Sequence, residues 1–136
     1  MHRQIFVNLP VRNIERTKAF YASLGFEFNP QFSNDQALCM IVGENIYAML
    51  LAEGFFKGFT KKPIADAREA TEVLLCVSCE SRAEVDAQVA KALAAGGKAP
   101  MPPQDHGFMY GHGFEDPDGH QWELMYMDPN AAPPHA

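Results

Sequence analysis

An internal repeat constrains the fold of this chain more than any other sequence feature. Each half opens with a β-favouring run, at residues 4–10 and 71–79, and each run precedes apolar residues at helical spacing. The helical patterns end at Gly25 in the first half and at Gly96 in the second. Three short strand candidates follow each helix: 26–32, 36–42 and 45–52, then 98–101, 107–115 and 120–127. Both halves therefore predict the order β-α-β-β-β.

Capping and turn residues support these boundaries. Asn13 is a plausible cap for the first helix, and Ser81 with Glu84 forms a capping box at the start of the second. In the run from Asp116 to Gly119, Pro117 presets φ for a type I turn and Gly119 can adopt the left-handed conformation. This run predicts a hairpin turn between the last two strands.

The repeat predicts an α+β fold in a single domain over residues 1–136. Neither half can cover both faces of its own sheet, so two βαβββ modules should form a curved, partly open mixed sheet around a central cleft, with helices outside. A connecting loop at 53–70 contains three Phe and could close over the cleft as a lid. The expected segments are module one at about 4–52, the loop at 53–70, module two at about 71–127, and a frayed tail at 128–136.

Composition excludes several classes of partner. The 136 residues carry a formal net charge of −6, and the 11 basic residues are scattered, which argues against nucleic-acid binding. No apolar run is long enough to span a bilayer, and the opening run is too short for a signal sequence. We therefore expect no membrane partner and a cytoplasmic location. Three cysteines are an odd, small number, so reduced thiols are expected.

Several motifs resemble the vicinal oxygen chelate superfamily, which includes glyoxalase I, bleomycin-resistance proteins and extradiol dioxygenases. The resemblance is carried by Leu9-Pro10-Val11, by Asn13 to Tyr21 with Leu24 to Phe26, and by Phe114 to Leu124 with its Asp-Pro-Asp-Gly-His turn. It covers roughly residues 4–127, and within the superfamily the chain looks most like small, single-domain, glyoxalase-like proteins. Members commonly pair as homodimers, so the resemblance implies a homodimer here.

The resemblance also implies where a divalent metal would bind in metal-using members. Those members place one ligand on the first strand and one on the last strand of each module, and the matching positions here are Phe6, Met49, Leu74 and Glu123. Only Glu123 can bind a metal ion, and shifting the register by one supplies no other ligand. The chain is thus expected to be a metal-free member with no cofactor. A relocated metal site made by His106, His112 and Glu123 stays open as an alternative.

Strand alternation selects the candidate site residues. Gln121, Glu123 and Met125 should face the cleft, whereas Trp122 should face the helices. A buried Glu123 would need a donor such as Asn8 or a raised pKa, which would suit it to proton transfer or to orienting a polar ligand. The candidate catalytic residues are Glu123 and His112. The candidate ligand-binding residues are Phe6, Asn8, Tyr47, Met49, Leu51, Phe56, Phe59, Phe108 and Tyr110.

Other reactive side chains have plainer interpretations. Cys76 and Cys79 form a Cys-x-x-Cys motif, but they precede the helix, so core cysteines are favoured over a redox pair. His106 and His112 are favoured as structural residues, and His120 is expected to be partly exposed beside its turn. Gly107, Gly111 and Gly113 precede no helix, so they indicate strand bending or close approach of a ligand rather than a phosphate loop.

Three function classes follow. The first is a protein that binds a small, partly apolar molecule in a cleft without the usual metal ligands, as bleomycin-resistance proteins sequester theirs. The second is a metal-dependent lyase, isomerase or dioxygenase with a relocated metal site. The third is an interaction module whose cleft is filled by its own loop. The missing ligands and the Phe-rich loop favour the first.

Overall fold

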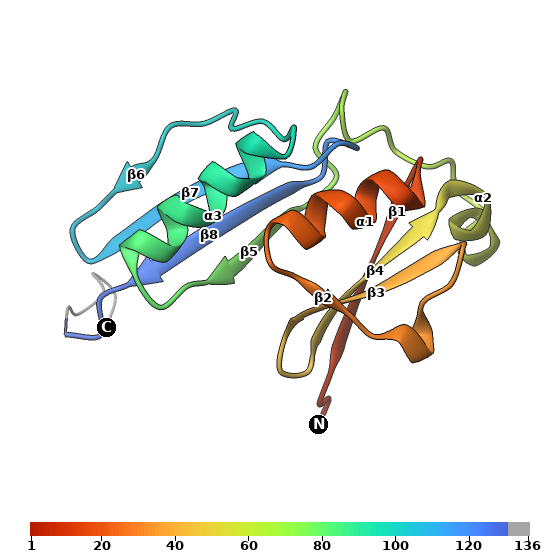
Figure 1. Ribbon diagram of the computed structural model, residues 1–136, viewed down its shortest axis with the longest axis horizontal. Coiled ribbons are helices and arrows are strands. Elements are labelled where there is room, and N and C mark those ends of the chain that lie inside the picture. Colours follow the sequence, from red (N-terminus) through yellow and green to blue (C-terminus); the bar gives the residue numbers. More distant parts are fainter. Residues whose placement is uncertain (131–136) are drawn as a thin grey trace. The chain divides into compact units, whose positions relative to one another are not determined.

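Each copy of the repeat folds into its own four-stranded sheet. The computed structural model describes residues 1–130, and these form two units that divide between Asp66 and Ala67, inside the predicted connecting loop. The element order confirms the α+β class and the two βαβββ modules (Figure 1).

Module one contains a mixed, open sheet with the strand order β1-β4-β3-β2. β1 runs parallel to β4, and the other neighbours are antiparallel. Its elements are β1 (Ile5–Val11), α1 (Ile14–Ser23), β2 (Glu27–Phe28), the 3-10 helix η1 (Pro30–Phe32), β3 (Ala37–Gly43) and β4 (Ile46–Ala52).

The core of module one lies between α1 and one face of this sheet. Leu9 of β1 pairs with Leu50 of β4, and both are buried with Phe20 of α1. Because side chains alternate between faces, Phe6 and Asn8 lie on the opposite, open face. The sequence thus divides each strand into a core row and an open-face row.

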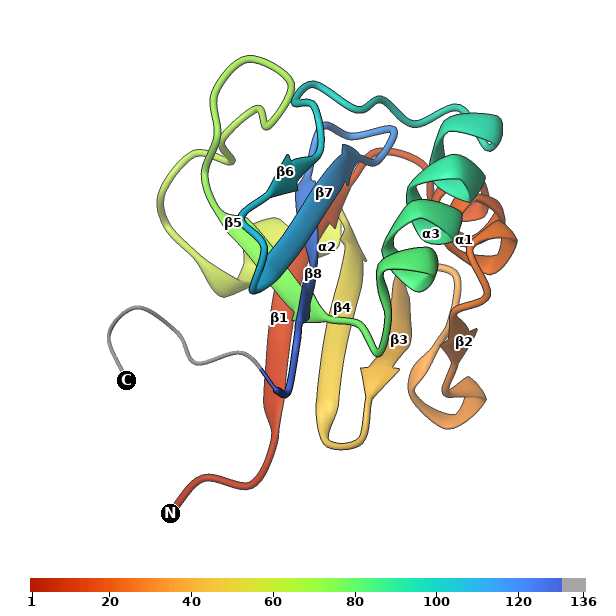
Figure 2. The same cartoon turned by 90° about the vertical axis from the view of Figure 1, so that its left-hand side faces the viewer.

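Module two repeats the arrangement with the strand order β5-β8-β7-β6, and α3 packs against β7 and β8 (Figure 2). Trp122 and Leu124 of β8 are buried on the helix-covered face, together with Val85 and Val89 of α3. Its elements are β5 (Leu74–Ser78), α3 (Arg82–Ala94), β6 (Gln104–Asp105), β7 (Met109–Glu115) and β8 (Gln121–Met127).

The predicted helix caps are confirmed. Asn13 Oδ1 accepts a hydrogen bond from the Arg16 backbone N–H at 2.9 Å, and Ser81 Oγ accepts one from the Glu84 N–H at 3.0 Å. The Glu84 carboxylate accepts a bond from the N–H of Glu80, one residue before the cap. These bonds pair backbone donors that a helix leaves free at its first turn.

Two predicted strands were too long, in both cases at prolines. The run 26–32 contains only β2, because Pro30 begins η1. The run 98–101 contains only an isolated bridge from Lys98 to Glu115, and β6 forms later, at 104–105. Prolines 100, 102 and 103 lack an N–H, so this stretch cannot continue a regular ladder beside β7.

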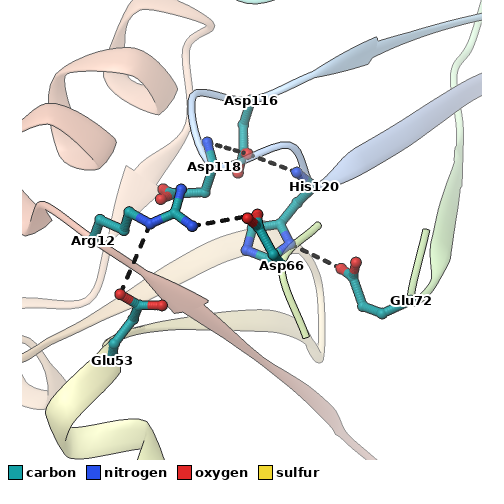
Figure 3. A network of polar contacts seen from close by, with 7 residues as sticks. All are labelled: Arg12, Glu53, Asp66, Glu72, Asp116, Asp118 and His120. Atoms are coloured by element: carbon teal, nitrogen blue, oxygen red, sulfur yellow. Dashed lines mark hydrogen bonds and ion pairs between the residues drawn. The ribbon is translucent and has the colours of Figure 1, made fainter. Parts of the chain in front are cut away.

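The connecting segment is partly helical rather than a plain loop. It contains α2 (Glu53–Phe56) and the 3-10 helix η2 (Lys57–Phe59). Arg12, directly after β1, lies 3.9 Å from a Glu53 oxygen and 3.3 Å from an Asp66 oxygen, so these two residues of the segment are linked to module one (Figure 3). In residues 1–130 no helix is long and apolar enough to cross a bilayer. Most of the tail predicted to fray, 131–136, lies outside the described residues.

Candidate functional site

The open face of module one holds an apolar cavity of about 490 Å³. β1 contributes Phe6, β4 contributes Tyr47 and Met49, and β3 contributes Cys39. The remaining lining residues come from the chain before β1 and from the β2–β3 connection: Gln4, Asn29 and Phe32. None of the lining side chains carries a formal charge, and burial raises the pKa of the Cys39 thiol, which keeps it neutral.

Two aromatic rings form one wall of this cavity. Phe6 and Tyr47 are direct partners in the parallel ladder, and their rings stack with centroids 4.9 Å apart and planes inclined by 12°. Phe6 remains 49% exposed, so a broad aromatic surface faces outward from the sheet. Such a surface can accept a planar ring by offset stacking.

The other residues predicted to bind a ligand in this half lie elsewhere. Asn8 is exposed on the open face and Leu51 is buried, and neither lines the cavity. Phe56 and Phe59 belong to the helical segment after β4, and Phe59 packs edge-on against Phe55 with centroids 5.3 Å apart. The predicted Phe lid therefore does not close this cavity, because these rings are held beyond the far end of β4.

Module two has its own cavity on the open face of its sheet, with a volume of about 440 Å³. Leu74 and Cys76 of β5 line it together with Glu123 of β8, the three residues that alternation placed on one face. The segment after α3 adds Pro100, Met101 and Pro102 to the wall.

Two glycines help to hollow out this cavity. Gly111 pairs with Met125 and Gly113 pairs with Glu123 across the β7–β8 ladder. A Cβ atom at Gly113 would lie 2.6 Å from the Trp122 carbonyl oxygen, so the two backbones approach too closely for a side chain. These glycines therefore permit the backbones of β7 and β8 to approach closely, and the absence of side chains on β7 leaves space beside Glu123.

His112 does not join Glu123, contrary to the predicted pairing of candidate catalytic residues. His112 pairs with Leu124, whereas Glu123 pairs with Gly113, so the two side chains lie on opposite faces of the sheet. The His112 ring Nε2 is 3.1 Å from the Met101 carbonyl oxygen, a hydrogen bond that holds the cavity wall against β7. His112 therefore contributes to the cavity wall beside Met101, but its side chain does not lie beside Glu123.

The aromatic residues predicted on the same strand also face away from Glu123. Tyr110 shares the face of His112, and its hydroxyl donates a hydrogen bond to Asp86 of α3, which raises the pKa of Tyr110. Phe108 precedes β7 and does not line the cavity. His106 does line it, on an exposed turn beside Phe108.

Glu123 is exposed, so the requirements stated for a buried carboxylate at this position do not apply. β5 is the edge strand of its sheet, and the cavity beside it lies on the open face. The prediction of a core cysteine fails at Cys76 for the same reason, because Cys76 is exposed. Although Cys76 is exposed, partial desolvation and the charge of Glu123 both raise the pKa of its thiol, and desolvation raises the pKa of Cys79 to about 11.

His120 is buried, with only 2% exposure, contrary to the expectation of a partly exposed residue. Asp116 Oδ1 accepts hydrogen bonds from the N–H groups of Asp118 and His120, and His120 Nδ1 is 2.9 Å from a Glu72 oxygen (Figure 3). Gly119 has φ +87, as the predicted turn requires. The tight turn directs the His120 side chain into the interior of the protein, which indicates a structural role. His120 lines neither cavity.

The positions that the resemblance associates with a metal do not fit a divalent ion. Phe6, Met49 and Leu74 offer no oxygen or imidazole nitrogen, and the thiol nearest Glu123 is kept neutral by its raised pKa. Residues 1–130 contain no group of three or more His, Cys, Asp and Glu side chains placed to hold a metal. The alternative site of His106, His112 and Glu123 is therefore not assembled in module two.

This fold and its paired modules match one family. A model of the Glyoxalase/Bleomycin resistance protein/Dioxygenase superfamily matches residues 3–124, and the chain belongs to that superfamily. A search of curated proteins found no match.

Solved structures share the fold. Hypothetical protein SA1046 from S. aureus is 27% identical, with a TM-score of 0.78 over 93% of this chain and 95% of its own. A glyoxalase/bleomycin resistance protein/dioxygenase family enzyme from Burkholderia phytofirmans is 19% identical, with a TM-score of 0.73 over 90% and 96%. The fosfomycin resistance protein FosX from Mesorhizobium loti is 14% identical, with a TM-score of 0.67 over 93% and 92%.

Proposed function

We propose that the protein binds a small, partly apolar molecule, and that module one holds an uncharged aromatic part of it without a metal ion. The observation that carries this proposal is the lining of the module-one cavity, where the Phe6–Tyr47 stack stands beside Cys39 and Met49 and no lining side chain is charged. A ligand that carried charge into this cavity would lose its hydration without gaining a partner there.

The chemistry of the cavity favours binding over turnover. Tyr47, Asn29 and Gln4 offer polar atoms that can orient a ligand, but the lining contains no carboxylate or imidazole to move a proton. Its volume of about 490 Å³ is within the range of sites for small ligands. Sequestration of a small molecule is thus the activity that we propose.

Binding of Nile red, an uncharged planar aromatic dye, tests this proposal by fluorescence titration. Phe6→Ala should weaken binding about threefold to tenfold, because an aromatic contact is worth roughly 0.5–1.5 kcal/mol. The matched control is Phe59→Ala, which removes a ring that is 68% exposed and lies outside the cavity. Equal losses in the two variants, or none in Phe6→Ala, would contradict the proposed site.

A further inference from the structure

We propose that the module-two cavity binds an organic ammonium group, with the carboxylate of Glu123 as its counter-charge. This site involves other residues than the module-one cavity, so the inference goes beyond the proposed function. It rests on the charge, the surroundings and the geometry of Glu123.

The charge of Glu123 is uncompensated within the cavity. Glu123 is the only carboxylate among the lining residues, which include no Lys or Arg. Its ladder partners are Gly113, which has no side chain, and Cys76, whose thiol has a pKa raised by partial desolvation and by the negative charge of Glu123. The lining also includes His106, on an exposed turn, and His112, whose ring Nε2 is 3.1 Å from the Met101 carbonyl oxygen rather than beside Glu123. A cation that enters this cavity therefore meets a single carboxylate.

The rest of the lining suits an alkyl or aryl ammonium better than a small hydrated ion. Three thioether side chains, Met101, Met109 and Met125, and the aliphatic Leu74 surround the approach to Glu123. Methionine side chains are flexible and polarisable and adapt to ligands of varied shape. They can cover the hydrocarbon part of a ligand while its nitrogen donates to Glu123.

A metal ion is a poorer match for the same cavity. Calcium takes six to eight oxygen ligands and zinc takes about four ligands. The lining contains Glu123, two histidines and Cys76, but within residues 1–130 no three His, Cys, Asp or Glu side chains are placed to hold one ion. An ammonium group needs only one carboxylate and further acceptors such as amide oxygens. The donor set therefore selects an organic cation.

The test compares two probes of similar size, benzylammonium and benzyl alcohol, titrated at low salt and followed by two-dimensional NMR. The wild-type protein should bind benzylammonium about fivefold to tenfold more tightly, as expected for a partly exposed charged contact. In Glu123→Gln this preference should fall to about onefold, while benzyl alcohol binding stays unchanged. Glu44→Gln removes one negative charge from the exposed β3–β4 turn and should keep the full preference.

Cys76 reports where the probe binds. Cys76 lines the cavity and is exposed, whereas Cys39 is buried, so alkylation by iodoacetamide should mark Cys76 before Cys39. Benzylammonium should slow alkylation of Cys76 in the wild-type protein and should have no such effect in Glu123→Gln. Protection of this thiol would locate the ammonium beside Glu123.

Three results would overturn the inference. The first is equal binding of both probes by the wild-type protein, and the second is an equal loss of preference in Glu44→Gln, which would indicate only long-range attraction. The third is a Glu123-dependent displacement of benzylammonium by micromolar Zn²⁺ or Mn²⁺, which would assign the carboxylate to a metal. Glu123 does not line the module-one cavity, so Nile red binding there should be unchanged in Glu123→Gln, and failure of the ammonium test leaves the module-one result separate.

Discussion

Replacing Gly119 by Ala should destabilise the fold by about 2–4 kcal/mol, combining left-handed strain and backbone overlap. Gly119 has φ +87, where an alanine is strained by roughly 1 kcal/mol. Its Cβ would also lie 2.6 Å from the Arg68 nitrogen and 2.7 Å from the Ala67 carbonyl carbon. Because both contacts are backbone, relief requires the connecting segment to move, and such overpacking adds roughly 1–3 kcal/mol.

Gly96→Ala isolates the steric part of this effect. Gly96 has φ +100, but a Cβ there would meet nothing within 4 Å, so only the conformational strain of about 1 kcal/mol applies. Both variants restrict the unfolded chain equally, and this effect cancels in their difference.

Urea unfolding followed by the fluorescence of Trp122 provides the measurement, with the free energy of unfolding taken from the midpoint and the slope. Gly119→Ala should lose about 1–3 kcal/mol more than Gly96→Ala. Equal losses would show that the turn relaxes freely away from residues 67–68, and the packing argument would then be wrong.

Two further predictions concern β7 and its neighbours. Gly113→Ala should lower stability by about 1–3 kcal/mol, since its Cβ would overlap the Trp122 carbonyl, whereas Gly111→Ala, with 3.4 Å to its nearest atom, should lose less. An equal loss, measured by urea unfolding, would refute this. The hydrogen bond from Arg82 lowers the pKa of Asp105 below 3.8, so the pair should stabilise the fold above this pH and stop doing so as pH falls through the lowered value. In an NMR titration, Arg82→Gln should move the Asp105 midpoint up toward 3.8, and an unchanged midpoint would contradict the pairing.

Local rules were enough to predict the frame of the molecule. Gly25 and Gly96 end their helices with φ +95 and +100, and Asn13 and Ser81 cap them as the sequence indicates. Each signal depends on a few neighbouring residues whose conformational preferences are strong. The duplicated pattern of such signals therefore defined both modules.

The site was harder to predict because the residues of β7 that face the cavity are glycines. β7 alternates glycines with His112 and Phe114, and sequence reasoning assigned the cavity to the positions that carry side chains. The structure places the glycines beside Glu123 and turns the larger residues toward the helix. Large side chains are the usual sequence signal of a binding face, whereas this cavity forms where Gly111 and Gly113 have no side chain.

Exposure was also poorly predicted, because it depends on distant segments. Cys76 was expected in the core, yet it lies on an edge strand and is exposed. His120 was expected near the surface, yet Glu72, 48 positions earlier, binds its ring and only 2% of it is exposed. Neither outcome can be derived from the few residues around the motif.

The alternation of core and open-face residues along β1 and β4 has an evolutionary consequence. Leu9 and Leu50 are buried in the core of module one, while Phe6 and Met49, on the reverse side of the same strands, line its cavity. Under the proposed function, mutations at the second pair would change the ligand while the buried pair is left intact. A duplicated chain of this kind can therefore diverge toward new ligands one module at a time, and descendants with the same scaffold need share little of their binding chemistry.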